Sequence, residues 1–169
     1  ARKVERKPEI LSLEQIKKLL SEARDQQHPW YPVWTLALLT GCRSGELQGL
    51  RVEDCSLISL EAAHIQGQLP KEKRNYGTIT VDRAWNSSEM RFSTTKGKYW
   101  RMVPVSSDLY WFLQKLMENN FGSDEFGRFL LPVFEIWRRG NQAAVIRPFC
   151  EEIRIPSVCF HTLRACFAT

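Results

Sequence analysis

Three short segments of the chain contain arginine, histidine and lysine residues at spacings that suit the binding of an anion. The first runs from Leu39 to Asp54 and contains Gly41, Arg43 and Glu46. A glycine followed by a tight helix start presents backbone N–H groups, and a nearby guanidinium adds a planar pair of donors, so this segment suits a phosphate group. A helix–turn–helix corner in which Arg43 merely pairs with Glu46 is the alternative that this segment alone leaves open.

The second segment, Phe160 to Thr169, places His161 and Arg164 three positions apart in a stretch predicted to begin a helix. Residues at i and i+3 share one helix face, and close to a helix N-terminus that face favours an anion. The alternative is a surface histidine and arginine on an ordinary amphipathic helix whose apolar side faces the core.

The third segment, Thr94 to Pro104, is predicted to form a turn between two strands, with Lys96 and Lys98 on either side of a glycine. A lysine at the tip of such a turn is usually only solvated. It gains a function only where an anion lies against it.

The order and content of the three segments resemble the tyrosine recombinases, also called phage integrases. The family's first box, T-G-x-R-x-x-E-L-x-x-L-x-x-x-D, is matched by Thr40, Gly41, Arg43, Glu46, Leu47, Leu50 and Asp54. Its second box, H-x-L-R-H-T-F-A-T, is matched by His161, Leu163, Arg164, Phe167, Ala168 and Thr169, whereas Ala165 and Cys166 depart from it. The family's lysine between the boxes corresponds to Lys96, counted back from Val103-Pro104, with Lys98 as the second candidate.

The resemblance implies that Arg43, Lys96, His161 and Arg164 surround one scissile phosphodiester of double-stranded DNA. Arg43 and Arg164 would clamp the non-bridging oxygens, and His161 would hydrogen-bond the phosphate and assist proton transfer. Lys96 would be the general acid toward the departing 5′-hydroxyl. No metal and no cofactor are expected, because the arginines supply the positive charge. The parent protein would recombine or integrate DNA through a 3′-phosphotyrosyl intermediate.

The family places its nucleophilic tyrosine C-terminal to the second box, whereas every tyrosine of this chain precedes His161: Tyr31, Tyr76, Tyr99 and Tyr110. We therefore expect the chain to lack the nucleophile and to be inactive alone. By the same resemblance, a full-length parent, phage-encoded or from a mobile element, would be a tetramer on DNA in the cytoplasm, and this chain a monomer without DNA. A non-catalytic DNA-binding remnant of the fold and a basic protein unrelated to DNA are the alternatives.

Composition agrees with one soluble domain that binds a polyanion, although it does not prove such a partner. The 169 residues carry a net charge of +5, with an isoelectric point near 9.1. The cysteines are five in number and form no CxxC pair, so we expect reduced thiols rather than disulfides or a zinc site. The sequence contains neither an apolar run of about 20 residues nor a secretory signal.

The predicted fold class is mixed α+β, mainly helical, with a small antiparallel three-stranded sheet. Residues 1–10 are predicted to be an arm and residues 11–169 one catalytic domain. Ser12 opens a capping box with Gln15, which predicts a helix over 13–25. A second helix over 33–39 should end at Gly41, and a short third helix should carry Glu46.

Beyond these helices, residues 56–76 are predicted to be a long solvated connection. Residues 77–85, 90–94 and 99–105 are predicted to be the three strands, and the turn at 95–98 makes the last two a hairpin. Ser106 or Ser107 should cap an amphipathic helix over 109–117, which a loop at 120–132 follows. A helix around 141–153 should be kinked or divided by Pro148, and a last helix should start at His161.

Overall fold

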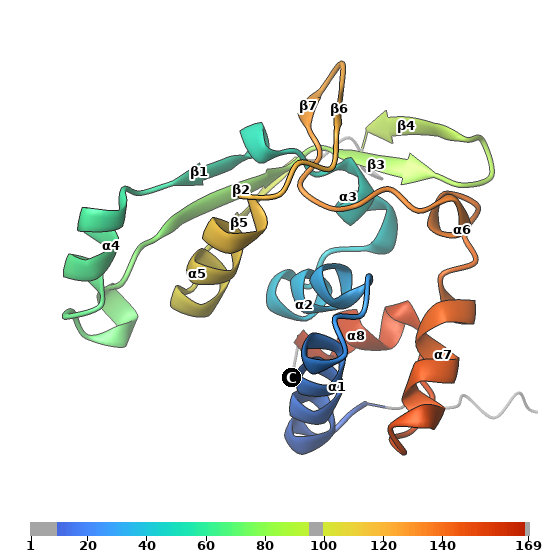
Figure 1. Cartoon of the computed structure of the whole chain (residues 1–169). Helices are drawn as coiled ribbons and strands as arrows, with labels where there is room; N and C mark the ends of the chain where they lie inside the picture. The colour runs from blue at the N-terminus through green and yellow to red at the C-terminus, as the bar shows by residue number, and fades with distance from the viewer. Residues whose placement is uncertain (1–9, 95–99, 168–169) are drawn as a thin grey trace, which may run out of the picture. The chain divides into compact units, whose positions relative to one another are not determined.

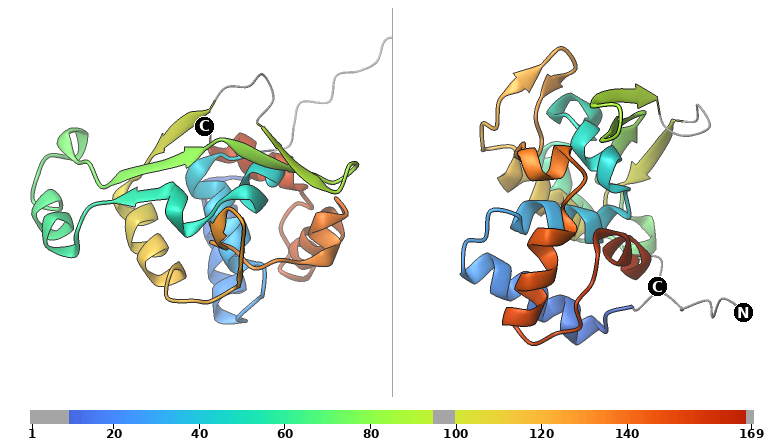
Figure 2. Two further views of the ribbon diagram at one scale, coloured as in Figure 1. Left: turned by 90° about the horizontal axis from the view of Figure 1, so that it is seen from above. Right: turned by 90° about the vertical axis from the view of Figure 1, so that its right-hand side faces the viewer.

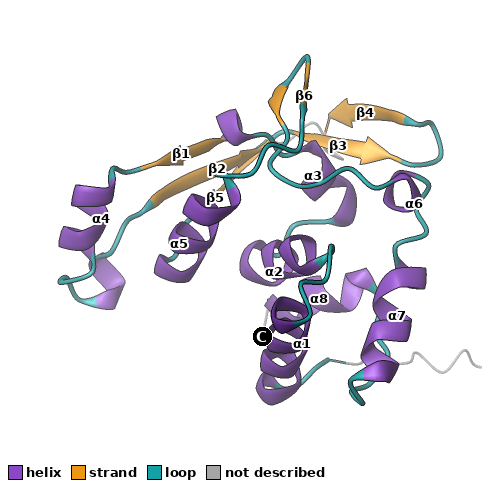
Figure 3. Ribbon diagram, viewed as in Figure 1, coloured by secondary structure: helices purple, strands orange, loops and turns teal. Residues whose placement is uncertain are grey.

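The computed structural model of the chain describes residues 10–94 and 100–167. These form two compact units: residues up to 43 together with residues from 141 onward, and residues 44–140. Figure 1 labels the helices and strands, and Figure 3 colours them by type. The mixed α+β class with small antiparallel sheets is confirmed. Lys96 and Lys98, and also Ala168 and Thr169, lie outside the described residues.

The first unit is built from four described helices: α1 (Leu13–Asp25), α2 (Tyr31–Thr40), α7 (Ala143–Glu152) and α8 (Phe160–Phe167). The capping box is confirmed, because the Ser12 hydroxyl accepts from the Gln15 N–H and the Gln15 side chain accepts from the Ser12 N–H. Helix α2 packs against both α1 and α8. Its core residues are almost wholly inaccessible to solvent and include Val33, Trp34, Leu36, Ile146, Phe149 and Leu163.

Two boundaries in this unit differ from the prediction. Helix α2 begins at Tyr31 rather than 33, because Pro32 fits the first turn of a helix, where its missing N–H is not needed. Of the predicted kink or division at Pro148, the division does not occur, since α7 runs through this residue to Glu152. Burial of Ile146, Phe149 and Cys150 along α7 compensates for the hydrogen bond that the proline cannot donate.

The second unit contains a three-stranded antiparallel sheet in the order β1 (Cys55–Leu57), β2 (Gly77–Val81), β5 (Arg101–Pro104). Ile79 pairs with Cys55 on one side and with Val103 on the other, and Ile79, Val81 and Val103 are buried. Helix α5 (Ser107–Leu116), capped by Ser106, lies beside this sheet in Figures 1 and 2. The Tyr110 hydroxyl of α5 donates to the Ile58 carbonyl and fixes the helix there.

The membership of the predicted sheet was wrong. The expected strand 77–85 is two strands, β2 and β3 (Arg83–Asn86), which are separated at Asp82. β3 pairs with β4 (Arg91–Thr94) in a separate two-stranded sheet, while β5 pairs with β2. Asn86 closes the tight β3–β4 turn by accepting the N–H groups of Ser88 and Glu89. β4 and β5 therefore belong to different sheets and do not pair with each other, while the predicted turn at 95–98 lies outside the described residues.

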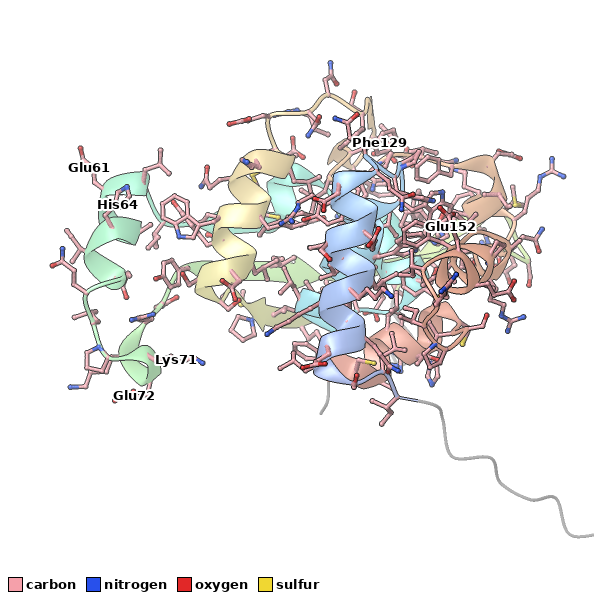
Figure 4. The ribbon with its side chains drawn as sticks, turned by 60° about the horizontal axis from the view of Figure 1, so that its bottom comes forward. Glu61, His64, Lys71, Glu72, Phe129 and Glu152 are labelled. Carbon is pink, nitrogen blue, oxygen red and sulfur yellow. The ribbon has the colours of Figure 1, made fainter. Side chains whose placement is uncertain are left out.

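The prediction of a solvated loop at 56–76 was also wrong. This segment contains β1, helix α4 (Leu60–Gln66) and a turn of 3-10 helix, η2 (Lys71–Lys73). Ser59 caps α4 by accepting the Ala62 N–H, and the Arg74 guanidinium donates to the carbonyls of Gly67 and Leu69. Figure 4 shows Glu61 and His64 on α4 and Lys71 and Glu72 on η2.

The remaining elements of the second unit are short. They are α3 (Ser44–Gly49), η1 (Val52–Asp54), β6 (Ser123–Asp124), β7 (Gly127–Arg128) and α6 (Glu135–Arg138). β6 and β7 form a two-stranded hairpin within the loop predicted at 120–132. In the part of the chain that the structure describes, no helix is both long and apolar enough to cross a membrane.

Candidate anion site

A hydrogen bond joins the two sequence segments that were predicted to bind an anion. Arg164, on α8, donates from Nε to the backbone carbonyl of Gly41, which directly follows α2, at 3.0 Å. The two residues are 123 positions apart in the sequence and belong to the same compact unit. The contact is part-buried.

The corner that contains Gly41 has a conformation that its own residues specify. Gly41 ends α2 in the left-handed region, with φ of 67°, and its N–H donates to the Ala37 carbonyl. The Thr40 hydroxyl donates to the Leu36 carbonyl at 2.7 Å and accepts the Cys42 N–H at 3.2 Å. The chain therefore leaves the helix in a defined direction, and Arg43 is the second residue after Gly41.

The predicted ligands Arg43, His161 and Arg164 all belong to the first unit. The Cα atom of Arg43 lies within about 7 Å of that of Gly41, because two residues of extended chain span no more. His161 precedes Arg164 by three positions on α8, so the two side chains neighbour each other on one face, as predicted. Arg43 and His161 are exposed and Arg164 is half-buried. Guanidinium and imidazole groups of this kind are the donors that an anion site requires.

The start of α8 provides a further group beside His161. Cys159 directly precedes the helix, and its carbonyl accepts the Thr162 N–H. Burial raises the pKa of the Cys159 thiol, but hydrogen bonds from the Thr162 side chain and from the backbone of Thr162 and His161, together with nearby Arg147, give a net pKa below the ordinary value. Sequence reasoning missed this residue, because cysteine is not a usual helix cap.

In the second unit, the glutamate of the first box has a partner that the sequence did not reveal. Glu46, on α3, is only 1% exposed and accepts hydrogen bonds from both terminal nitrogens of Arg101, the first residue of β5. Ser44 begins α3, and its hydroxyl accepts from the indole N–H of the buried Trp137 at 2.7 Å. The helix that follows Arg43 is thus held at two of its residues.

The described tyrosines differ in burial. Tyr76 and Tyr110 are buried, and the Tyr110 hydroxyl is already hydrogen-bonded to the Ile58 carbonyl. Tyr31 is half-buried in the first turn of α2. Tyr99 lies outside the described residues.

Metal ligands are not clustered in the described part of the chain. Among residues 10–94 and 100–167, no group of three or more histidine, cysteine, aspartate or glutamate side chains could hold a metal ion. The described cysteines form no disulfide, and Cys42, Cys150 and Cys166 are buried. Burial, with Asp54 and Glu53 adding to it, raises the pKa of Cys55 to about 12, so this thiol stays protonated.

Solved structures of DNA integrases and recombinases have the same fold. The Tn1549 transposon integrase (residues 82–397, R225K) in complex with a circular intermediate DNA matches 99% of this chain and 54% of its own, with 19% identity and a TM-score of 0.68. The XerA recombinase matches 97% of this chain and 50% of its own, with 21% identity and a TM-score of 0.63. The XerH site-specific recombinase bound to difH substrate matches 99% of this chain and 44% of its own, with 16% identity and a TM-score of 0.55.

No protein-family model and no curated protein sequence matches the chain. The chain spans about half the length of the solved proteins that it matches. At these identities the likeness establishes the fold of the chain.

Proposed function

We propose that this chain is the greater part of a tyrosine recombinase catalytic domain, and that its parent protein recombines or integrates DNA by cleaving and rejoining strands. The hydrogen bond between Arg164 and the Gly41 carbonyl is the observation that carries the proposal. It unites the two boxes that the sequence places 123 positions apart. The fold shared with a DNA-bound integrase supports the same function.

In the proposed mechanism, Arg43 and Arg164 bind the non-bridging oxygens of one DNA phosphate. Two guanidinium groups stabilise the extra negative charge that develops on a pentacoordinate phosphorus. His161 hydrogen-bonds the same phosphate and assists proton transfer. No metal ion or cofactor is needed in this scheme, because the two arginines neutralise the charge.

Lys96 is proposed as the general acid that protonates the leaving 5′-hydroxyl, with Lys98 as a second DNA-binding lysine. These assignments come from the sequence, since residues 95–99 lie outside the described residues. Arg101, which follows this segment closely in the chain, begins β5, the strand that contains Val103 and Pro104.

The nucleophile of the reaction is proposed to be a tyrosine that this chain does not contain. The chain alone should then form no covalent DNA adduct, although its parent would form a 3′-phosphotyrosyl bond. Incubation with duplex DNA followed by a denaturing gel tests this, and a covalent adduct would refute it. A non-catalytic DNA-binding remnant of the fold remains the second candidate, which a recombination assay of the parent protein would separate from the first.

DNA binding by the chain is the direct test of the site. We expect weak binding to duplex DNA whose affinity falls steeply with salt, because phosphate contacts release counterions. Arg43→Ala and Arg164→Ala should each weaken binding and lower the salt slope by about 1. Fluorescence anisotropy over a series of salt concentrations measures both quantities.

The matched control is Arg24→Ala, on the same compact unit. Arg24 is exposed on α1 and pairs with Asp25, so it contributes the same charge at a different place. If Arg24→Ala lowers the slope as much as the two site variants do, binding is a property of net charge alone and the proposed site is wrong. Sedimentation of the free chain should show a monomer, whereas the parent is proposed to form a tetramer on DNA.

A further inference from the structure

Gly41 has two contacts with α8 that a residue with a side chain could not keep together. Its carbonyl accepts the Arg164 Nε–H at 3.0 Å, and the ring of Phe167 lies against its Cα. A Cβ atom built on Gly41 would overlap the Phe167 ring, at 2.9 Å from Cε1 and closer still to Cδ1. Gly41 also has φ of 67°, which is costly for a residue with a side chain. Position 41 therefore requires glycine on two independent grounds.

The hydrogen bond has a consequence for the direction of the Arg164 guanidinium. This group is planar and rigid, so fixing Nε fixes the plane and the directions of the four N–H bonds on the terminal nitrogens. An arginine whose Nε is held loses less rotational freedom when the terminal nitrogens bind an anion. The hydrogen bond to Gly41 uses the Nε of Arg164 and neither terminal nitrogen.

Phe167 maintains the distance between the two segments. It follows Arg164 by three positions on α8, so both side chains leave the helix on the face that meets Gly41. The ring is 52% exposed, which is more than a simple core contact would leave. Helix α8 thus contacts Gly41 through one polar and one aromatic side chain, and a change at Gly41 displaces both.

We propose that Gly41 is a positioning residue of the anion site: its carbonyl orients the guanidinium of Arg164, and its bare Cα allows Phe167 to hold α8 at the distance this requires. The inference rests on the proposed function for the identity of the anion, a DNA phosphate. The orientation of Arg164 does not depend on that identity and can be measured without DNA.

The first measurement uses the unaltered chain labelled with ¹⁵N. The Arg164 Nε–H signal, assigned by its loss in Arg164→Lys, should exchange with water more slowly than that of the exposed Arg147 by about tenfold or more. Equal exchange rates for the two arginines would overturn the positioning role. This result stands whether or not the chain binds DNA.

The second measurement uses Gly41→Ala, Gly41→Ala/Phe167→Ala and the control Gly67→Ala. Gly67 ends α4 with φ of −60°, and a Cβ there meets its neighbours at an ordinary 3.4 Å or more. Gly41→Ala should accelerate exchange of the Arg164 Nε–H and weaken binding to a mixed-sequence duplex by about tenfold. Removing the Phe167 ring in the double variant should restore part of the slow exchange and part of the DNA affinity. Gly67→Ala should change neither the exchange rate nor the affinity.

The outcomes separate the two proposals. If the unaltered chain protects the Arg164 Nε–H but does not bind DNA, the proposed function fails and the positioning role stands. If folded Gly41→Ala has a lower unfolding midpoint yet keeps both the slow exchange and the DNA affinity, Gly41 is merely structural and the inference is wrong. If Gly41→Ala does not fold, the double variant and the unaltered chain still decide the question.

Discussion

Arg101 donates hydrogen bonds from both terminal nitrogens to the carboxylate of Glu46, a residue 55 positions earlier in the chain. The carboxylate is buried, while the Arg101 side chain is 39% exposed. The pair joins α3, which directly follows Arg43, to the first residue of β5. A helix of six residues is not stable by itself, so contacts of this kind determine where α3 lies.

The Glu46–Arg101 pair should show strong coupling in a double-mutant cycle. Arg101→Met removes two charge-assisted hydrogen bonds from a buried carboxylate, which should cost about 3 kcal/mol of unfolding free energy. Adding Glu46→Gln removes the charge of that carboxylate as well, so the double variant should be more stable than Arg101→Met by about 1 kcal/mol or more. Urea denaturation of the four proteins measures the coupling. Strictly additive losses would mean that the two side chains do not interact in solution.

The same pair shows why parts of the fold were predictable from sequence and parts were not. Local signals were sufficient for α1, α2 and α5, because Ser12, Gly41 and Ser106 act on residues within one helical turn. The partner of Glu46 and the pairing of β5 with β2 depend on contacts between distant residues, and no local pattern encodes their register.

Helix α4 was missed although a local signal was present. Ser59 is a good N-cap and Gly67 follows the helix, but Leu60 and Ile65 are exposed and give no apolar stripe to recognise. In the candidate site, motif order predicted Arg43, His161 and Arg164, whereas the Gly41 carbonyl could not be predicted, because a backbone acceptor has no signature in the sequence. The roles of Arg43, Lys96, Lys98, His161 and Arg164 stay predictions.

A second ion pair, between the buried Arg51 and the half-buried Asp124, should make the protein sensitive to acid. Arg51 is 0% exposed; it donates from Nε and a terminal nitrogen to Asp124, and its guanidinium lies over the rings of Phe92 and Phe129. The hydrogen bond from Arg51 holds the pKa of Asp124 below its ordinary value, against the opposing effect of burial. The stability from this ionised carboxylate is therefore complete above about pH 4 and is lost as the pH falls through the lower, folded-state pKa.

Asp124→Asn tests this linkage. The variant should be less stable than the unaltered chain at pH 7 by about 2 kcal/mol, because the arginine loses its charged partner. The difference should shrink as the pH falls from about 4 through the lower folded-state pKa of Asp124, below which both chains lack the charge. Thermal unfolding monitored by circular dichroism from neutral to acidic pH measures it. A difference that is independent of pH would mean that Asp124 acts only through its shape.

His28 should give a second pH dependence, in a different range. Its Nδ1 accepts the Trp30 N–H at 3.1 Å, and its ring lies against Trp34 and Phe149, so the fold requires the neutral imidazole. Burial lowers the pKa of His28, and Glu152 opposes this in part. The contribution of His28 is therefore complete above its ordinary pKa of about 6.5 and is lost as the pH falls through the lower folded-state pKa.

The matched variant is His28→Asn, because its amide oxygen can accept the same Trp30 N–H but does not titrate near neutral pH. The melting temperature of the unaltered chain should fall more between pH 7 and pH 5 than that of His28→Asn. If the melting temperatures of the two proteins fall equally between pH 7 and pH 5, His28 binds a proton as readily in the folded state as in the unfolded state.

Cys159 should prove to be a weak helix cap that serine can replace with a gain in stability. It directly precedes α8, its Sγ atom lies 3.5 Å from the Thr162 hydroxyl, and backbone groups of His161 and Thr162 hydrogen-bond it. A hydroxyl is a better acceptor than a thiol at this position, so Cys159→Ser should stabilise the chain by about 0.5 kcal/mol, whereas Cys159→Ala should destabilise it.

The advantage of serine should depend on pH. Despite the opposing effect of burial, these hydrogen bonds and Arg147 hold the pKa of Cys159 below its ordinary value, so the thiolate is favoured by folding. Its stabilising effect appears as the pH rises through the folded-state pKa and is complete above the ordinary value of about 8.5. Denaturation under reducing conditions should therefore show that the advantage of Cys159→Ser in unfolding free energy is smaller at pH 9 than at pH 7. The other thiols are common to both proteins, so their effects cancel in this comparison. A difference in unfolding free energy that is the same at both pH values would mean that Cys159 caps α8 only as a neutral thiol.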